Sequence, residues 1–106
     1  MSKLRPECYD SKEEALPDDT ALYMIRDSIA RRKVLIYGRL KDDKGHYCAI
    51  GAFWKDNPRT TLNSRLIDEV AAVNDSVPPT ATPQERWKKV NSWIRWKLRV
   101  LATAKR

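Results

Sequence analysis

His46 and Cys48, two residues apart, come nearest to a catalytic pair in this sequence. On a β-strand, residues two apart point to the same side, where histidine could act as a base and cysteine as a nucleophile. The same two residues, with Cys8, could supply metal ligands, but a structural zinc site takes four nitrogen or sulfur ligands. Small and apolar residues surround Cys48, and in such surroundings cysteine usually packs as a small hydrophobe. We therefore expect no catalytic residue, no metal and no cofactor.

Three pairs of adjacent acidic residues are the next candidates for chemistry: Asp18 with Asp19, Asp42 with Asp43, and Asp68 with Glu69. Their positions predict a helix cap, a turn and the solvent-facing side of a helix, respectively. The sequence has no Gly-rich phosphate loop and no Gly-x-Ser-x-Gly motif. The pattern favours a binding protein and predicts that the chain is not an enzyme.

The densest cluster of charged and aromatic residues runs from Thr82 to Arg106. Residues 83–106 carry eight Lys/Arg and one Glu, whereas residues 1–82 carry thirteen of each sign, so the whole formal charge of +7 belongs to this stretch. Basic residues beside tryptophans can bind nucleic acid, anchor a protein interface or lie at a membrane surface. Residues 1–20 carry six acids against three bases, so this acidic segment could also pair with the basic one.

The same stretch has the features of one long helix. Thr82 can cap the first amides, Pro83 suits the first helical position, and Glu85 can reach back to the cap. At about 100° per residue, one apolar stripe is expected to face the core. That stripe contains Trp87, Val90, Ile94, Leu98 and Leu101. Trp93 and Trp96 lie at its side, and the pattern leaves open whether they are buried or exposed.

The candidate partner-binding residues lie outside this apolar stripe. They are Lys88, Lys89, Arg95, Trp96 and Arg99. Those at positions 88, 95 and 99 are expected on the face opposite the stripe. Cations on such a face could contact an acidic protein surface or nucleic-acid phosphates.

The sequence pattern as a whole predicts a mainly α fold with about three to four helices and one short β-hairpin. A chain of 106 residues forms one small domain. We expect an N-terminal arm over residues 1–17 and a helical domain over residues 18–106, with the hairpin at about 34–48.

Local signals place the remaining helices. Asp18 or Asp19 is expected to cap a first helix that runs to about Arg32. Residues 48–54 are ambiguous between a strand and a buried helix, and their small residues favour the helix. Thr60 or Thr61 is expected to open a third helix with Asn74 as its C-cap.

Composition also predicts a compartment. No apolar run approaches the ~20 residues that span a bilayer, and the first residues lack the apolar stretch of a signal peptide. Two cysteines without a framework of pairs suit a reducing compartment. We therefore expect a cytoplasmic protein with no membrane partner.

Residues 45–53 (GHYCAIGAF), a following helix that ends in VND, and the sequence TPQERW resemble a family of small uncharacterised proteins from phages and actinobacterial genomes. The family shares the order helix, hairpin, Cys-Ala-x-Gly-Ala segment, helix and Thr-capped final helix. The similarity covers roughly residues 20–100. It implies a fold order and a phage origin, but no activity, cofactor or catalytic residue.

These observations favour a non-enzymatic phage or mobile-element protein in the host cytoplasm. We expect it to bind a host protein or nucleoprotein machine and to inhibit or redirect that machine, an anti-defence role that includes the anti-CRISPR type. The alternative is an accessory protein that binds nucleic acid through the basic C-terminal helix. Partner identity and oligomeric state stay open.

Overall fold

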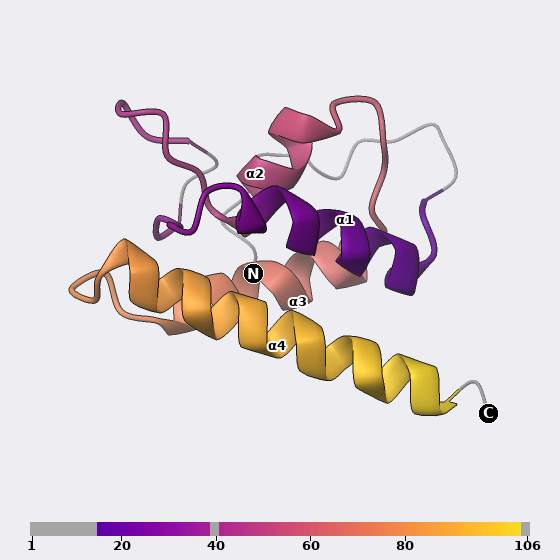
Figure 1. The fold of residues 1–106 in the computed structure, drawn as a ribbon. Coiled ribbons are helices and arrows are strands. Elements are labelled where there is room, and N and C mark those ends of the chain that lie inside the picture. The colour runs from indigo at the N-terminus through magenta and orange to yellow at the C-terminus, as the bar shows by residue number, and fades with distance from the viewer. Residues whose placement is uncertain (1–14, 39–40, 105–106) are drawn as a thin grey trace.

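Four helices make up the fold of the described residues, which are 15–38 and 41–104 of this computed structural model. They are α1 (Asp18–Ala30), α2 (Ala49–Asp56), α3 (Ser64–Ser76) and α4 (Pro83–Ala104). Helix α1 packs against α2 and α4, and α3 packs against the same two helices (Figure 1). This arrangement confirms the predicted mainly α fold. The predicted N-terminal arm lies almost entirely outside the described residues.

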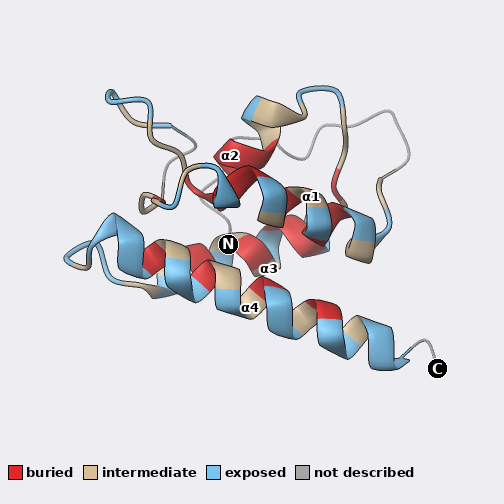
Figure 2. Ribbon diagram, viewed as in Figure 1, coloured by how far each residue is buried: buried red, intermediate tan, exposed pale blue. Residues whose placement is uncertain are grey.

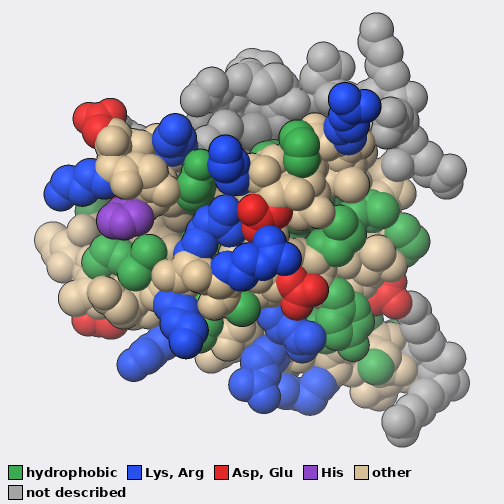
Figure 3. Space-filling model, turned by 45° about the horizontal axis from the view of Figure 1, so that its top comes forward, with side chains coloured by type: hydrophobic (Ala, Val, Ile, Leu, Met, Phe, Trp, Pro, Cys, Tyr) green, Lys and Arg blue, Asp and Glu red, His purple; other side chains and the backbone are tan. Residues whose placement is uncertain are grey.

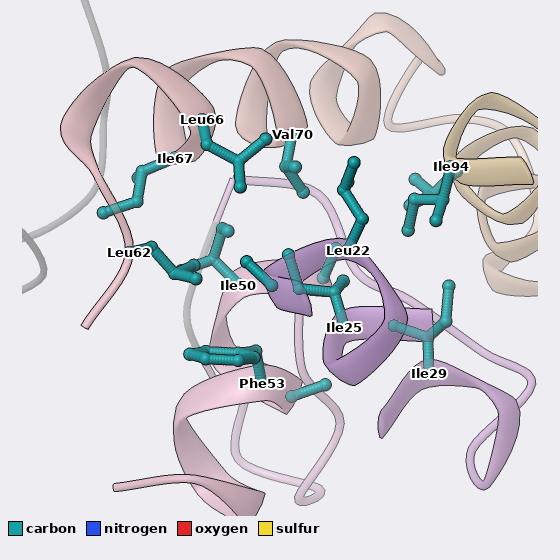
Figure 4. Close-up of a cluster of buried hydrophobic side chains, with 14 of the residues drawn as sticks. Leu22, Ile25, Ile29, Ile50, Phe53, Leu62, Leu66, Ile67, Val70 and Ile94 are labelled. Carbon is teal, nitrogen blue, oxygen red and sulfur yellow. The ribbon is translucent and has the colours of Figure 1, made fainter. Parts of the chain in front are cut away.

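The core lies where the four helices face one another. Each helix has one buried side and one exposed side (Figure 2). The side chains drawn and labelled in Figure 4 come from every helix and from the segment before α3: Leu22, Ile25, Ile29, Ile50, Phe53, Leu62, Leu66, Ile67, Val70 and Ile94. Complete burial of one such side chain stabilises the fold by about 1.5–3 kcal/mol.

The start of α1 differs from the predicted acidic cap. Pro17 occupies the N-cap position, and no side chain caps the helix there. Asp18 and Asp19 lie in the first turn, where their charges suit the helix dipole. Asp18 instead accepts hydrogen bonds from Asn63 and from the guanidinium of Arg65, at 2.7 and 2.5 Å. The carboxylate that was expected to cap α1 therefore ties α1 to the start of α3.

The predicted hairpin is not confirmed. No strand occurs in residues 15–38 or 41–104, and a single antiparallel bridge joins Lys41 to Tyr47 around the turn. The backbone N–H of Leu35 donates to the carbonyl of Pro83, and the carbonyl of Ile36 accepts from the side chain of Asn74. The N–H of Ile36 does donate to the carbonyl of Tyr47 at 3.1 Å, so the two sides of the turn lie together. The groups that bond to α3 and the start of α4 are not available for a longer strand ladder.

The ambiguous segment after the turn is a helix, as its small residues predicted. Cys48 is the N-cap of α2, and its Sγ accepts a hydrogen bond from the N–H of Gly51 at 3.3 Å. Ala49, Gly51 and Ala52 are buried. Their small size lets α2 lie close to α1 and α3.

Both predicted ends of α3 are wrong. The helix begins at Ser64 with Asn63 as its cap, not at Thr60 or Thr61, because the side chain of Asn63 accepts the N–H of Leu66 at 2.8 Å. Asn74 is inside the helix and buried. Its amide oxygen accepts the first N–H of α2, and its amide nitrogen donates to the carbonyl of Ile36. It therefore caps α2 and not its own helix.

A bidentate ion pair joins the end of α1 to the end of α2. The two guanidinium nitrogens of Arg32 lie 2.9 and 3.0 Å from the carboxylate oxygens of Asp56, and Arg31 adds a third contact at 3.1 Å. The side chains of Arg32 and Asp56 are only 21% and 17% exposed. The hydrogen bond from Arg32 lowers the pKa of Asp56, while burial raises it, and the result is below the ordinary value.

We expect Asp56→Asn to lower the free energy of unfolding by about 1 kcal/mol near neutral pH. A carboxylate whose pKa is lowered in the folded state stabilises the fold above its unfolded pKa, and this contribution disappears as the pH falls through the folded pKa. The difference between the two proteins should therefore decline as the pH falls below the ordinary pKa of 3.8 and vanish below the lowered pKa of the folded state. Urea denaturation near neutral pH and in acid measures this difference in the free energy of unfolding. A difference that persists unchanged in acid would contradict the ion-pair explanation.

Candidate functional site

Helix α4 is built as its sequence signals predicted. The hydroxyl of Thr82 accepts the N–H of Glu85 at 3.1 Å, and Pro83 is the first helical residue. In the apolar stripe, Val90, Ile94 and Leu98 are buried. Trp87 and Leu101, the two ends of the stripe, are half-buried against the same core.

The two tryptophans left open by the sequence differ in exposure. Trp93 is half-buried against the core, and the ammonium of Lys97 lies 6.0 Å from the centre of its ring. Trp96 is 49% exposed, and Val100, one turn further along the helix, is 40% exposed. The outward side of α4 therefore presents two apolar side chains to solvent.

The three basic residues predicted to lie opposite the buried stripe lie instead at its edge. Arg95 and Arg99 are exposed, but they lie beside Leu98 on the side of α4 that faces α1. Lys88 is two helical turns before Arg95, so it shares that side. Lys89 and Trp96 lie on the outward side of the helix. The candidate residues thus belong to two adjacent surfaces of α4.

A hollow of about 300 Å³ lies between α1 and α4 at Arg95 and Arg99. Its wall on the α1 side consists of Tyr23 and Arg26, and its wall on the α4 side also includes Leu98 and Ala102. The guanidinium of Arg26 lies 5.0 Å from the centre of the Tyr23 ring. Tyr23 and Arg26 were not predicted as site residues, because the only sequence signal that connects them is their spacing of three residues on one helix.

Most other arginines of the described residues are neutralised. Arg31 and Arg32 pair with Asp56, and Arg65 pairs with Asp18 and Glu69. By contrast, the cations at the junction of α1 and α4 form no ion pair with any described residue. We call these four residues the basic flank: Arg26, Lys88, Arg95 and Arg99.

Lys and Arg side chains gather over α1 and α4 on the face drawn in Figure 3. Acidic side chains lie between some of them, as in the ion pairs at the end of α1. The surface is therefore mixed in sign where the helices pair, and positive along the basic flank.

The proposed His–Cys pair loses its geometric basis. His46 and Cys48 do not lie on a strand, and Cys48 is only 4% exposed at the start of α2. The imidazole of His46 lies 3.7 Å from the carboxylate of Asp42, inside the turn. No group of three or more potential metal ligands occurs in the part of the chain that the structure describes, and Cys8 lies outside it.

We expect thiol reagents to label Cys48 slowly in the folded protein, since its thiol is buried and engaged at the N-cap. In a Cys8→Ser background, Cys48→Ala should lower the free energy of unfolding by about 1 kcal/mol because it removes the cap acceptor. Cys48→Ser should lose less, since serine is itself a favoured N-cap residue. Labelling rates and urea denaturation test both statements. Fast native labelling, together with lost biological activity in Cys48→Ala, would restore the catalytic hypothesis.

None of the helices in residues 15–38 and 41–104 has both the length and the apolar character needed to cross a bilayer. No protein-family model, curated protein or solved structure matches this chain. The resemblance to phage and actinobacterial proteins stays a prediction, as do the partner-binding residues of α4.

Proposed function

We propose that this protein acts without catalysis, by binding a host protein or nucleoprotein machine and inhibiting or redirecting it. The observation that supports this proposal most strongly is the outward side of α4. Trp96 and Val100 are exposed there, one turn apart, and Lys89 lies on the same side about two turns before Trp96. Exposed tryptophan is typical of the few residues that dominate binding energy at protein interfaces.

The biological setting of this proposal is the cytoplasm of a phage-infected host. It is supported by the resemblance of residues 45–53 to small phage proteins and by the absence of a catalytic motif in the sequence. An anti-defence role, such as an anti-CRISPR protein, suits a small chain that works by binding.

A second candidate function is direct binding of nucleic acid. It is supported by Lys88, Lys89, Arg95 and Arg99, which have no ion-pair partner among the described residues. Cations that are not neutralised within the fold are available to replace the counterions of nucleic-acid phosphates.

Affinity capture from host lysate, with and without nuclease, separates the two candidates. We expect a defined host protein to be retained after nuclease treatment if the first is correct. Recovery of nucleic acid alone, lost after nuclease treatment, would make nucleic-acid binding the favoured function. A charge-matched unrelated domain on the same resin controls for nonspecific capture by the net charge of +7.

A further inference from the structure

The hollow between α1 and α4 collects three arginines from two helices. Arg26 comes from α1, and Arg95 and Arg99 come from successive turns of α4. No acidic residue of the described ranges 15–38 and 41–104 lines the hollow. Like charges that converge without a counterion repel one another, so an anion that occupied the hollow would relieve a cost that the folded protein otherwise carries.

The guanidinium of Arg26 contacts an aromatic ring of its own helix. It lies 5.0 Å from the centre of the Tyr23 ring, three residues earlier on α1. A cation–π contact of this kind limits the freedom of the long side chain. An anion would therefore meet an already ordered donor, which reduces the entropy lost on binding.

The lining of the hollow also includes a ring and an apolar wall. Tyr23 is half exposed, and Leu98 and Ala102 complete the wall beside the arginines. The carboxylates of an acidic peptide would pair with the arginines, but they would not supply a planar group to pack against the Tyr23 ring and the apolar wall. A positive groove with an exposed aromatic ring is the combination found where single-stranded nucleic acids bind.

One further cation, Lys88, lies beyond the hollow on the same side of α4. From Lys88 to Arg99 the helix rises about 16 Å at 1.5 Å per residue. A single phosphorylated side chain has no second charge to place so far away. A strand has a phosphate on every nucleotide, so it can contact the arginines and Lys88 together.

We infer that the hollow takes one nucleotide of a single-stranded nucleic acid, with the phosphate against Arg26, Arg95 and Arg99 and the base beside Tyr23 and Leu98. This inference rests on the proposed function and deepens it. The basic flank would hold the nucleic-acid component of a nucleoprotein partner, while the surface around Trp96 would contact the protein component.

The test uses the full chain and a fluorescently labelled short poly(dT) strand, titrated by anisotropy at low and physiological salt. We expect binding that weakens steeply with salt. Arg26→Gln should raise the Kd roughly tenfold or more, because it removes a charge-assisted hydrogen bond to phosphate. Tyr23→Leu should also raise it by about tenfold, because it removes both the stacking of the base and the ring contact of Arg26.

Arg59→Gln is the matched control for Arg26→Gln. Arg59 is exposed in the segment after α2, and its replacement removes the same charge at another place on the surface. We expect this control to change the Kd by no more than about twofold, because exposed charges at a distance are screened. Circular dichroism melting curves should show that all three variants stay folded.

Three results would overturn the inference: no binding of poly(dT) at low salt, equal effects of Arg26→Gln and Arg59→Gln, or equally tight binding of a duplex of the same length. Displacement of the strand by a phosphoserine peptide at lower concentration than by unlabelled poly(dT) would assign the hollow to a phosphoprotein instead. Each of these results can occur while nuclease-resistant capture of a host protein succeeds, so failure of the inference is distinguishable from failure of the proposed function.

Discussion

Replacing Arg86 with methionine is expected to lower the free energy of unfolding by about 3 kcal/mol. Arg86 is only 2% exposed, although it lies on the most highly charged helix of the chain. Its guanidinium donates to the backbone carbonyls of Asn74, Val77 and Pro78, at the end of α3 and in the connector that follows. Methionine fills much of the same volume but leaves these carbonyls without their donor.

The large expected effect follows from where these carbonyls lie. The last carbonyls of a helix have no partner within it, and a buried one that loses its hydrogen bond costs about 1–3 kcal/mol. The guanidinium also lies 5.3 Å from the centre of the Tyr37 ring. Burial lowers the pKa of Arg86, while the negative charge of Asp75 raises it. One side chain therefore connects α4, the end of α3 and the segment before the turn.

Urea denaturation measures the effect, with two variants for comparison. Lys89→Met also replaces a cation of α4 with methionine, but at an exposed position, so we expect a change within about 0.5 kcal/mol. Arg86→Lys keeps the charge and loses the planar fork of donors, so its loss should fall between the two. If Arg86→Met and Lys89→Met unfold at the same urea concentration, the hydrogen bonds of Arg86 to the end of α3 and the connector do not stabilise the fold as expected.

Periodicity and capping signals were sufficient to predict most of α4. The spacing of Val90, Ile94 and Leu98 identified the buried side, and Thr82 and Pro83 identified the start. Both signals are local, because a helix repeats its faces every few residues and its free amides need a nearby acceptor. The same kind of signal favoured a helix after Cys48, where small residues lie close together.

Predictions that were wrong or not confirmed concern places where a distant residue decides the outcome. Residues 34–38 have the composition of a strand, but the N–H of Leu35 bonds to Pro83 and the carbonyl of Ile36 bonds to Asn74. Asn74 itself resembled a C-cap from its place in the sequence. Its partners lie on α2 and in the segment before the turn, and no local pattern specifies them.

The candidate site contains residues that local sequence patterns identify and residues that only the packing of helices brings together. Arg95, Arg99 and Trp96 could be selected from the sequence because charge and aromatic residues are concentrated on one helix. Arg26 and Tyr23 could not, because their relevance depends on the packing of α1 beside α4. Arg86 was missed for a related reason: at the edge of the apolar stripe it resembled the other basic residues, and only the end of α3 distinguishes it.

The second large effect concerns binding to the host partner. We expect Trp96→Ala to weaken retention of a nuclease-resistant host protein by roughly thirtyfold or more, which corresponds to an interface residue worth at least 2 kcal/mol. Trp96 is 49% exposed, so its truncation should leave the core and the melting temperature unchanged.

The double variant Arg95→Glu/Arg99→Glu should instead abolish binding of poly(dT), because two cations become anions in the basic flank.

The two variants together decide between a protein surface and a nucleic-acid surface on α4. An aromatic anchor acts through buried apolar area, so its contribution should change little between low and physiological salt, whereas contacts to phosphates should weaken steeply. We therefore expect Trp96→Ala to reduce protein capture at both salt concentrations and the charge reversal to act mainly on the strand. Titration of the purified partner by calorimetry, with melting curves for each variant, provides the measurement. Parent-like capture by Trp96→Ala, combined with strand binding at physiological salt that the charge reversal removes, would make nucleic-acid binding the principal function, because the aromatic anchor would then contribute nothing to the partner complex.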